Sequence, residues 1–231
     1  MIANLASEEK TEIEKISDRG EFSVAFDPLD GSSLVETNLA VGAIFGIFRG
    51  KEFIGKSGDE MAAAAYFVFG PRTVFVFSLG AAVFEFILNE LGEFSFSQKL
   101  EILPDAKTFS PGNLRAATEN ENYKKLVESW RNEKLTLRYS GGMVPDVHQI
   151  FAKKSGIFSY PGFSKFPRGK LRLLFECAPL AFLAEKSGGA ALNDFGKRIL
   201  DLKIAEIHER TPIFIGSKNA VENCVEVLRG S

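Results

Sequence analysis

Residue types that signal particular chemistries are scarce in this sequence of 231 residues. Cys177 and Cys224 are too few for a disulfide framework or a cysteine metal cluster, which favours a reduced, cytoplasmic setting. His148 and His208 lack metal-ligand spacing and are interpreted as structural or surface residues. The formal net charge of -2 leaves no basic excess to neutralise phosphates in bulk, so no nucleic-acid partner is expected.

Long apolar stretches are also missing. No run approaches the roughly 20 residues of a membrane span, and the first fifteen residues are acidic and lack a signal-peptide core. We therefore expect no membrane partner. Hydrophobic residues still make up 45% of the chain, with 22 Phe against one Trp. This composition predicts a sizeable core built largely on phenylalanine, which includes the Phe-rich strands.

Strands and helices alternate along the chain. Residue patterns predict strands at 22–26, 41–48, 73–77, 82–88 and 211–215, leave 62–69 open between strand and helix, and predict helices at 123–132, 145–154, 179–186 and 219–228. The interleaving indicates an α/β or α+β fold. Segment 96–112 is the best linker candidate, so we expect two halves, 1–108 and 109–231.

The stretch Phe26–Ser33, FDPLDGSS, carries the clearest candidate chemistry. Pro28 keeps the preceding residue extended, so Asp27 is expected to end the strand, and the turn returns Asp30 to the same side. Two carboxylates and the Leu29 carbonyl supply hard oxygen ligands next to Gly-Ser-Ser, a combination that suits Mg²⁺ and phosphate. A plain acidic surface turn explains this stretch alone equally well.

Other segments favour the site over the turn. Glu8 and Glu9 add two acids upstream, and Glu176 follows the apolar run that begins at Leu171. Lys170 and Arg172 alternate along that run, as phosphate-binding cations on one face of a strand would.

Together the motifs SEE, FDPLDGSS, RYSGGMVPDVH and GKLRLLFECAPLAFLAEKSGG resemble the class I fructose-1,6-bisphosphatase and sedoheptulose-1,7-bisphosphatase family. The resemblance runs from about Leu5 to the C-terminus. It implies the sugar-phosphatase fold, with layered sheets and helices in two halves, a metal-binding half at 1–108 and a sugar-phosphate-binding half at 109–231.

The resemblance implies a role for each matching residue. Two or three Mg²⁺ per subunit, or Mn²⁺, would be held by Glu8, Glu9, Asp27, the Leu29 carbonyl, Asp30 and Glu176, with Glu9, Asp27, Asp30 and Glu176 also catalytic. Substrate would be held by Asp30, Gly31, Ser32, Ser33, Asn120, Tyr123, Arg138, Tyr139, Gly141, Gly142, Met143, Tyr160, Lys170 and Arg172. Arg138 resembles an arginine that reaches into a neighbouring subunit, which implies a homodimer or homotetramer.

The implied reaction is hydrolysis of the 1-phosphate of fructose-1,6-bisphosphate by an activated water, as in gluconeogenesis or carbon fixation. Sedoheptulose-1,7-bisphosphate stays open as an alternative or second substrate, because KTFSPGNLRA is closer to the sedoheptulose enzymes while Tyr160-Pro161 is closer to the fructose enzymes. Glu21-Phe22 stands where AMP-regulated relatives carry Lys-Tyr, so AMP inhibition is not expected. Relatives also carry a helical segment with a mobile acidic loop before SEE, which leaves turnover by this chain open.

Two interpretations from other classes remain. Gly50–Ser57 matches the P-loop pattern G-x-x-x-x-G-K-[ST], but its interior holds Lys, Glu, Phe and Ile instead of small residues. A sugar-phosphate-binding module without catalysis is the third possibility. Cys177 has no supporting His pattern and is interpreted as a buried small residue instead of a nucleophile.

Overall fold

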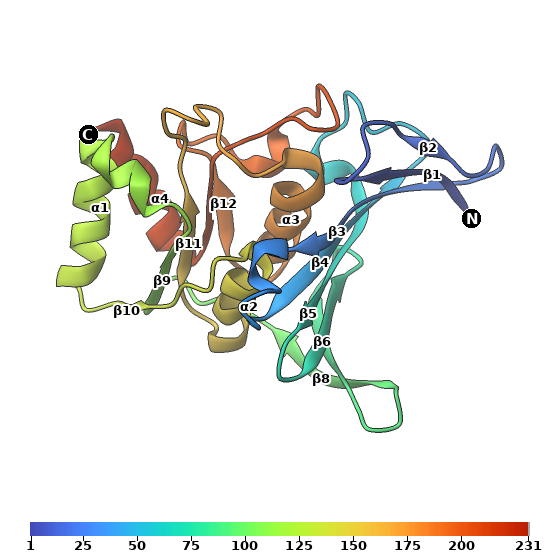
Figure 1. Ribbon diagram of the computed structural model, residues 1–231, viewed down its shortest axis with the longest axis horizontal. Helices are drawn as coiled ribbons and strands as arrows, with labels where there is room; N and C mark the ends of the chain where they lie inside the picture. The colour runs from blue at the N-terminus through green and yellow to red at the C-terminus, as the bar shows by residue number, and fades with distance from the viewer. Residues whose placement is uncertain (231) are drawn as a thin grey trace.

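The computed structural model describes residues 1–230, which form two β-sheets and four α-helices (Figure 1). The first sheet has the strand order β2-β1-β3-β4-β5-β6-β7-β8 and is antiparallel except for the parallel pair β1 and β3. Its strands are β1 (Ile2–Ser7), β2 (Glu14–Lys15), β3 (Phe22–Asp30), β4 (Val41–Arg49), β5 (Met61–Phe69), β6 (Thr73–Ser78), β7 (Val83–Leu88) and β8 (Phe94–Leu100). The region 62–69, left open by its sequence, is therefore a strand.

The second sheet has the order β10-β9-β11-β13-β12. Its strands are β9 (Thr108–Pro111), β10 (Thr136–Leu137), β11 (Ile157–Tyr160), β12 (Ala190–Leu192) and β13 (Ile213–Gly216). The helices are α1 (Glu121–Asn132), α2 (Met143–Lys153), α3 (Ala178–Lys186) and α4 (Lys218–Arg229). The mixed fold confirms the predicted α/β class.

The molecule is built in four layers. Helices α2 and α3 contact strands of both sheets and lie between them, whereas α1 and α4 pack together on the far side of the second sheet (Figure 1). Gly42 and Gly46 of β4 permit this close packing, because a Cβ there would meet Val144 of α2 at 2.5 Å and Pro179 of α3 at 3.1 Å. The chain crosses between the sheets over residues 101–107, so segment 96–112 is not a continuous linker but holds the end of β8 and all of β9.

Two further predictions about local structure were wrong. Strand β3 does not end at Asp27 but continues to Asp30, with a break in register between these residues where the proline interrupts regular pairing. The apolar run after Leu171 is not a strand, because Leu173–Cys177 forms a π-helical turn that leads into α3.

The P-loop interpretation is also wrong. A P-loop requires an α-helix directly after its Lys-Ser pair, so that backbone N–H groups surround the phosphates. Here Ser57 precedes a single 3-10 turn, Gly58–Glu60, and the chain then enters strand β5. The side chain of Lys56 donates to the carbonyl of Arg49 instead of pointing into a loop.

The Phe-rich strands are not core on both faces. Their inward-facing residues are buried against α2 and α3, but the outward-facing phenylalanines are half-buried or exposed and stack on one another across the sheet, as in Phe67 against Phe75 at 4.6 Å. No helix of residues 1–230 covers this outer face (Figure 1). No helix of these residues is long and apolar enough to cross a membrane.

Neighbouring residues of β4 test this two-faced sheet. Ile44 is fully buried on the inner face, so Ile44→Ala should lower the free energy of unfolding by about 2–5 kcal/mol. Phe45 lies half-buried on the outer face, so Phe45→Ala should cost less, although it removes more atoms. Urea denaturation of both variants measures the difference. A larger loss for Phe45→Ala would mean that the outer face is covered in solution.

Candidate active site

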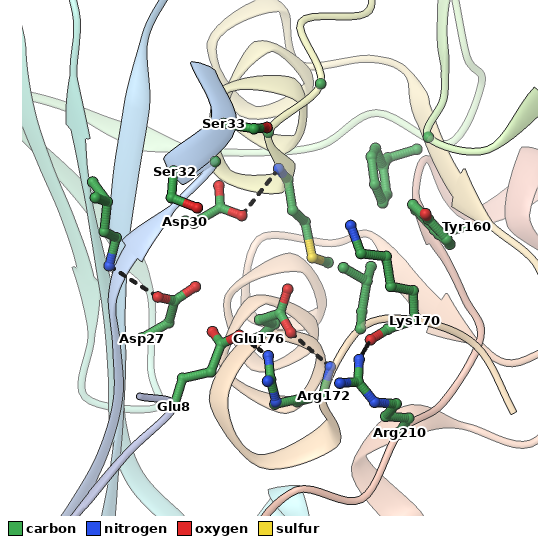
Figure 2. Close-up of a pocket in the computed structure, with 18 of the residues that line it drawn as sticks. Glu8, Asp27, Asp30, Ser32, Ser33, Tyr160, Lys170, Arg172, Glu176 and Arg210 are labelled. Atoms are coloured by element: carbon green, nitrogen blue, oxygen red, sulfur yellow. Dashed lines mark hydrogen bonds and ion pairs between the residues drawn. The ribbon is translucent and has the colours of Figure 1, made fainter. Parts of the chain in front are cut away.

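A pocket of about 280 Å³ opens where the ends of β1 and β3, the N-terminus of α2 and the π-helical turn meet (Figure 2). Both sheets contribute to its walls, because Gly112 and Tyr160 follow or end strands of the second sheet. Acidic side chains occupy one side of the pocket, and Lys170, Arg210 and Tyr160 lie at the other (Figure 2).

Three carboxylates converge on the acidic side. Glu8, Asp27 and Glu176 each place an oxygen within 4.8 Å of the others. The parallel pairing of β1 with β3 sets Ser7 beside Phe26 and so brings Glu8 next to Asp27. The π-helical turn supplies Glu176 from far along the chain.

Burial raises the pKa of Glu176 and of Asp27. The pKa of Glu176 is raised to about 8, chiefly by burial and to a smaller extent by the nearby Asp30 and Asp27. Burial lifts the pKa of Asp27 to about 6, with a smaller contribution from Glu9. Arg172 neutralises only part of the negative charge of these carboxylates. Its side chain pairs with Glu8, and its backbone N–H donates to the Glu176 carboxylate at 2.6 Å. Crowded, buried carboxylate oxygens of this kind fit a divalent cation such as Mg²⁺.

The remaining acids of the predicted metal set lie around this group. The Asp30 carboxylate accepts hydrogen bonds from the backbone N–H groups of Met143 at 3.2 Å and Val144 at 2.7 Å, so it anchors the first turn of α2. The pKa of Asp30 is raised to about 7, mainly by burial and less by the charge of Asp27. Glu9 is exposed at the rim, and Leu29 also lines the pocket.

Most predicted substrate-binding residues line the same pocket. They are Asp30, Gly31, Ser32, Ser33, Tyr139, Gly141, Gly142, Met143, Tyr160, Lys170 and Arg172. Gly31 adopts φ +81°, a left-handed conformation that turns the chain from β3 into the serines. Asp146 holds the glycine loop in place, since its carboxylate accepts from the backbone N–H of Ser140 at 2.7 Å.

Three predicted residues lie outside this pocket. Asn120 caps α1, with its side chain accepting from the Tyr123 backbone N–H at 3.0 Å. Tyr123 is fully buried in the core beneath α1, where its hydroxyl is 2.9 Å from Ser159 Oγ. Neither residue lines the pocket, because Asn-x-x-Tyr here starts a helix, and their contact with substrate stays a prediction. Arg138 is exposed and lines a separate hollow together with Lys107 and Gln149.

Four residues that the sequence interpretation missed line the pocket or its extension. Arg210 lines the main pocket, and an adjoining lobe of about 660 Å³ is bordered by Asn113, Arg115 and Lys165. The Asn113 side chain is 6% exposed, and its amide nitrogen is buried without a hydrogen-bond partner among the described residues. The motif KTFSPGNLRA contains both Asn113 and Arg115, so the sequence carries a signal that could have found them.

The chain's relatives are phosphatases of sugar bisphosphates. Residues 1–99 match the family "Fructose-1-6-bisphosphatase, N-terminal domain" and residues 102–229 match "Fructose-1-6-bisphosphatase, C-terminal domain". The chain belongs to the fructose-1,6-bisphosphatase family. This membership makes it a hydrolase of the phosphatase class and confirms the resemblance inferred from its motifs.

The relatives include enzymes named for either of the two candidate substrates, fructose-1,6-bisphosphate and sedoheptulose-1,7-bisphosphate. The chain is 45% identical to a class 1 fructose-1,6-bisphosphatase of Trichlorobacter lovleyi, over all of this chain and 73% of that protein. It is 47% identical to a chloroplastic sedoheptulose-1,7-bisphosphatase of Triticum aestivum, over 97% of this chain and 58% of that protein.

Solved structures share the fold. A sedoheptulose-1,7 bisphosphatase structure from Toxoplasma gondii superposes with a TM-score of 0.94 at 35% identity and covers 99% of this chain and 76% of its own. A Leishmania major fructose-1,6-bisphosphatase in the T-state gives 0.93 at 31% identity, covering 100% of this chain and 77% of its own.

The acidic group predicts a coupling between pH, Mg²⁺ and stability. Carboxyls whose pKa is raised on folding bind protons more readily in the folded state, so metal-free stability should fall as the pH rises from about 4 through 8. Added MgCl₂ should therefore raise the melting temperature more at pH 8 than at pH 5. Thermal melts with EDTA or MgCl₂ measure this, and Glu176→Gln should flatten the pH dependence. Identical melts under all four conditions would contradict a metal site.

The different surroundings of Asn113 and Asn120 give a second prediction. Asn113→Ala removes a donor from the pocket's extension and should raise KM for a sugar bisphosphate roughly tenfold. Asn120→Ala removes a helix cap and should lower the free energy of unfolding by about 1 kcal/mol without changing KM. Steady-state kinetics and urea melts on both variants test these roles. A raised KM in Asn120→Ala, with KM unchanged in Asn113→Ala, would show that Asn120 contacts the substrate.

Proposed function

We propose that this chain is a Mg²⁺-dependent phosphatase that hydrolyses the 1-phosphate of fructose-1,6-bisphosphate to fructose 6-phosphate and phosphate. One observation carries the proposal: Glu8, Asp27 and Glu176 meet within 4.8 Å in a pocket whose opposite side presents cations and tyrosines. A cation site at one end and anion-binding groups at the other suit a substrate with a phosphate at each end.

In this proposal the acidic side holds the metal ions. Glu8, Asp27 and Glu176 would ligate two or three Mg²⁺, together with Glu9, Asp30 and the Leu29 carbonyl. Bound Mg²⁺ supplies Lewis-acid stabilisation of phosphate oxygens and lowers the pKa of bound water. Mn²⁺ has similar ligand preferences and is the alternative ion.

The chain's own groups would orient the substrate. Ser32, Ser33 and Arg172 would hold the reacting phosphate in line with the attacking water. Tyr139, Tyr160 and Lys170 would hold the far end, and the glycine loop 141–142 would contact the sugar.

Transfer straight to water is favoured over a phosphoenzyme. Cys177 is fully buried, and burial with the neighbouring Glu176 raises its pKa well above the ordinary value, so its thiolate is not available as a nucleophile. In the hydrolysis, water oxygen bonds to phosphorus as the bond to the sugar oxygen breaks, and that oxygen leaves with a proton.

Three further parts of the proposal concern the setting of the reaction. Sedoheptulose-1,7-bisphosphate is the second candidate substrate, supported by the 47% identity to the Triticum aestivum enzyme. The exposed Arg138 supports a homodimer or homotetramer in which it enters the neighbour's pocket. The scarcity of cysteine favours the cytoplasm.

Phosphate release tests the function. The purified chain with MgCl₂ should release phosphate from fructose-1,6-bisphosphate, and sedoheptulose-1,7-bisphosphate run in parallel ranks the two substrates. Asp27→Asn should lower the rate about 100-fold or more, because it removes charge at the reacting group, while the exposed Glu52→Gln serves as the matched control. No release, combined with a thermal shift by fructose-1,6-bisphosphate, would instead identify a binding module without catalysis.

A further inference from the structure

Two arginines face each other across a short antiparallel bridge at the pocket wall. Arg172 and Arg210 are direct cross-strand partners. The flanking hydrogen bonds run from the Leu173 N–H to the Glu209 carbonyl at 2.7 Å and from the Thr211 N–H to the Leu171 carbonyl at 3.1 Å. This pattern defines a non-hydrogen-bonded pair, in which the Cα atoms lie about 4.5 Å apart and the side chains leave on the same face.

Such an arrangement is unfavourable in the absence of an anion. Like charges directly opposite one another destabilise a strand pair. Arg172 has one carboxylate partner, Glu8, which also belongs to the candidate metal group.

Arg210 itself has no carboxylate partner in the described part of the chain. One of its terminal nitrogens donates to the backbone carbonyl of Lys170, and its guanidinium lies over the Phe166 ring at 5.7 Å from the centroid. These contacts hold the head group at the pocket wall beside Lys170 (Figure 2). In addition, Arg172 Nε is buried without a hydrogen-bond partner among residues 1–230. The two arginines therefore have N–H donors without acceptors and positive charge that no carboxylate of the described residues neutralises.

We propose that Arg210 is a second phosphate-binding arginine of this pocket, which together with Arg172 holds the reacting phosphate group, with Arg210 approaching it from the side that faces away from the carboxylates. Guanidinium donors match the spacing of phosphate oxygens, and a shared dianion offsets the repulsion between the two arginines. The choice of a sugar bisphosphate as ligand rests on the proposed function, whereas phosphate recognition by the pair does not.

The proposal predicts opposite effects on stability and on binding. Without ligand, Arg210→Gln removes a repulsive charge, so the melting temperature should stay equal or rise. With ligand, the variant should lose a charge-assisted contact and weaken inorganic phosphate binding roughly 10- to 100-fold. A purely structural role for the bond to Lys170 predicts the reverse: a lower melting temperature with phosphate affinity unchanged.

The experiment compares the full chain with three variants in MgCl₂. Phosphate titrations by calorimetry and ligand-free melts are run on Arg210→Gln, on Arg210→Lys, which keeps the charge without the planar fork, and on Arg168→Gln. Arg168 is an exposed arginine in the adjoining turn that does not line the pocket. We expect weak, intermediate and unchanged affinity in that order. For fructose-1,6-bisphosphate, KM should rise in parallel with a change in kcat below about threefold.

Each outcome decides the assignment. Unchanged phosphate affinity in Arg210→Gln, or no phosphate binding by the full chain, would overturn it. If the full chain hydrolyses neither bisphosphate but Arg210→Gln still weakens phosphate binding, the proposed function fails while the phosphate-binding role of Arg210 is supported.

Discussion

Repulsion among Glu8, Asp27 and Glu176 is the constraint on which the rest of the structure depends. Ionised carboxylates within 4.8 Å of one another in a buried pocket oppose folding, and Arg172 supplies the one arginine contact to this group that the structure of residues 1–230 records. The fold must therefore hold these acids together by other means. A divalent cation would be bound by the same carboxylates and would remove their repulsion. The group that lowers the stability of the metal-free fold is thus also the group that would hold the metal.

The architecture supplies the means. Parallel pairing of β1 with β3 fixes Glu8 beside Asp27, and the π-helical turn ahead of α3 brings in Glu176. The sandwiched helices make these positions rigid, because α2 is tied to the acidic turn through the Asp30 carboxylate. The site thus lies where both sheets and the inner helix layer meet, so residues from both parts of the chain line one pocket.

The acidic turn, its glycine and its serines could be predicted because they are adjacent in the sequence and carry their chemistry in the residue types. Glu176 stood out as a lone acid after an apolar run, but only the resemblance connected it to Asp27. The resemblance did not reveal that Asn120 caps a helix or that Tyr123 is buried in the core, because both facts depend on packing. Arg210 could not be assigned to the site from the sequence. Its proposed role depends on an isolated bridge to Arg172, and a bridge of one residue pair leaves no strand pattern in the sequence. The exposure of the outer phenylalanines of the first sheet could not be predicted either, because residue type does not reveal which face of a sheet the helices cover.

A crystal structure of this chain soaked with Mn²⁺ tests the central claim most directly, through anomalous scattering from the metal. We expect metal peaks bonded to carboxylate oxygens of Glu8, Asp27 and Glu176, with Arg172 no longer paired to Glu8. A fully occupied Mn²⁺ elsewhere on the chain, with these carboxylates still bare and Arg172 still on Glu8, would contradict it.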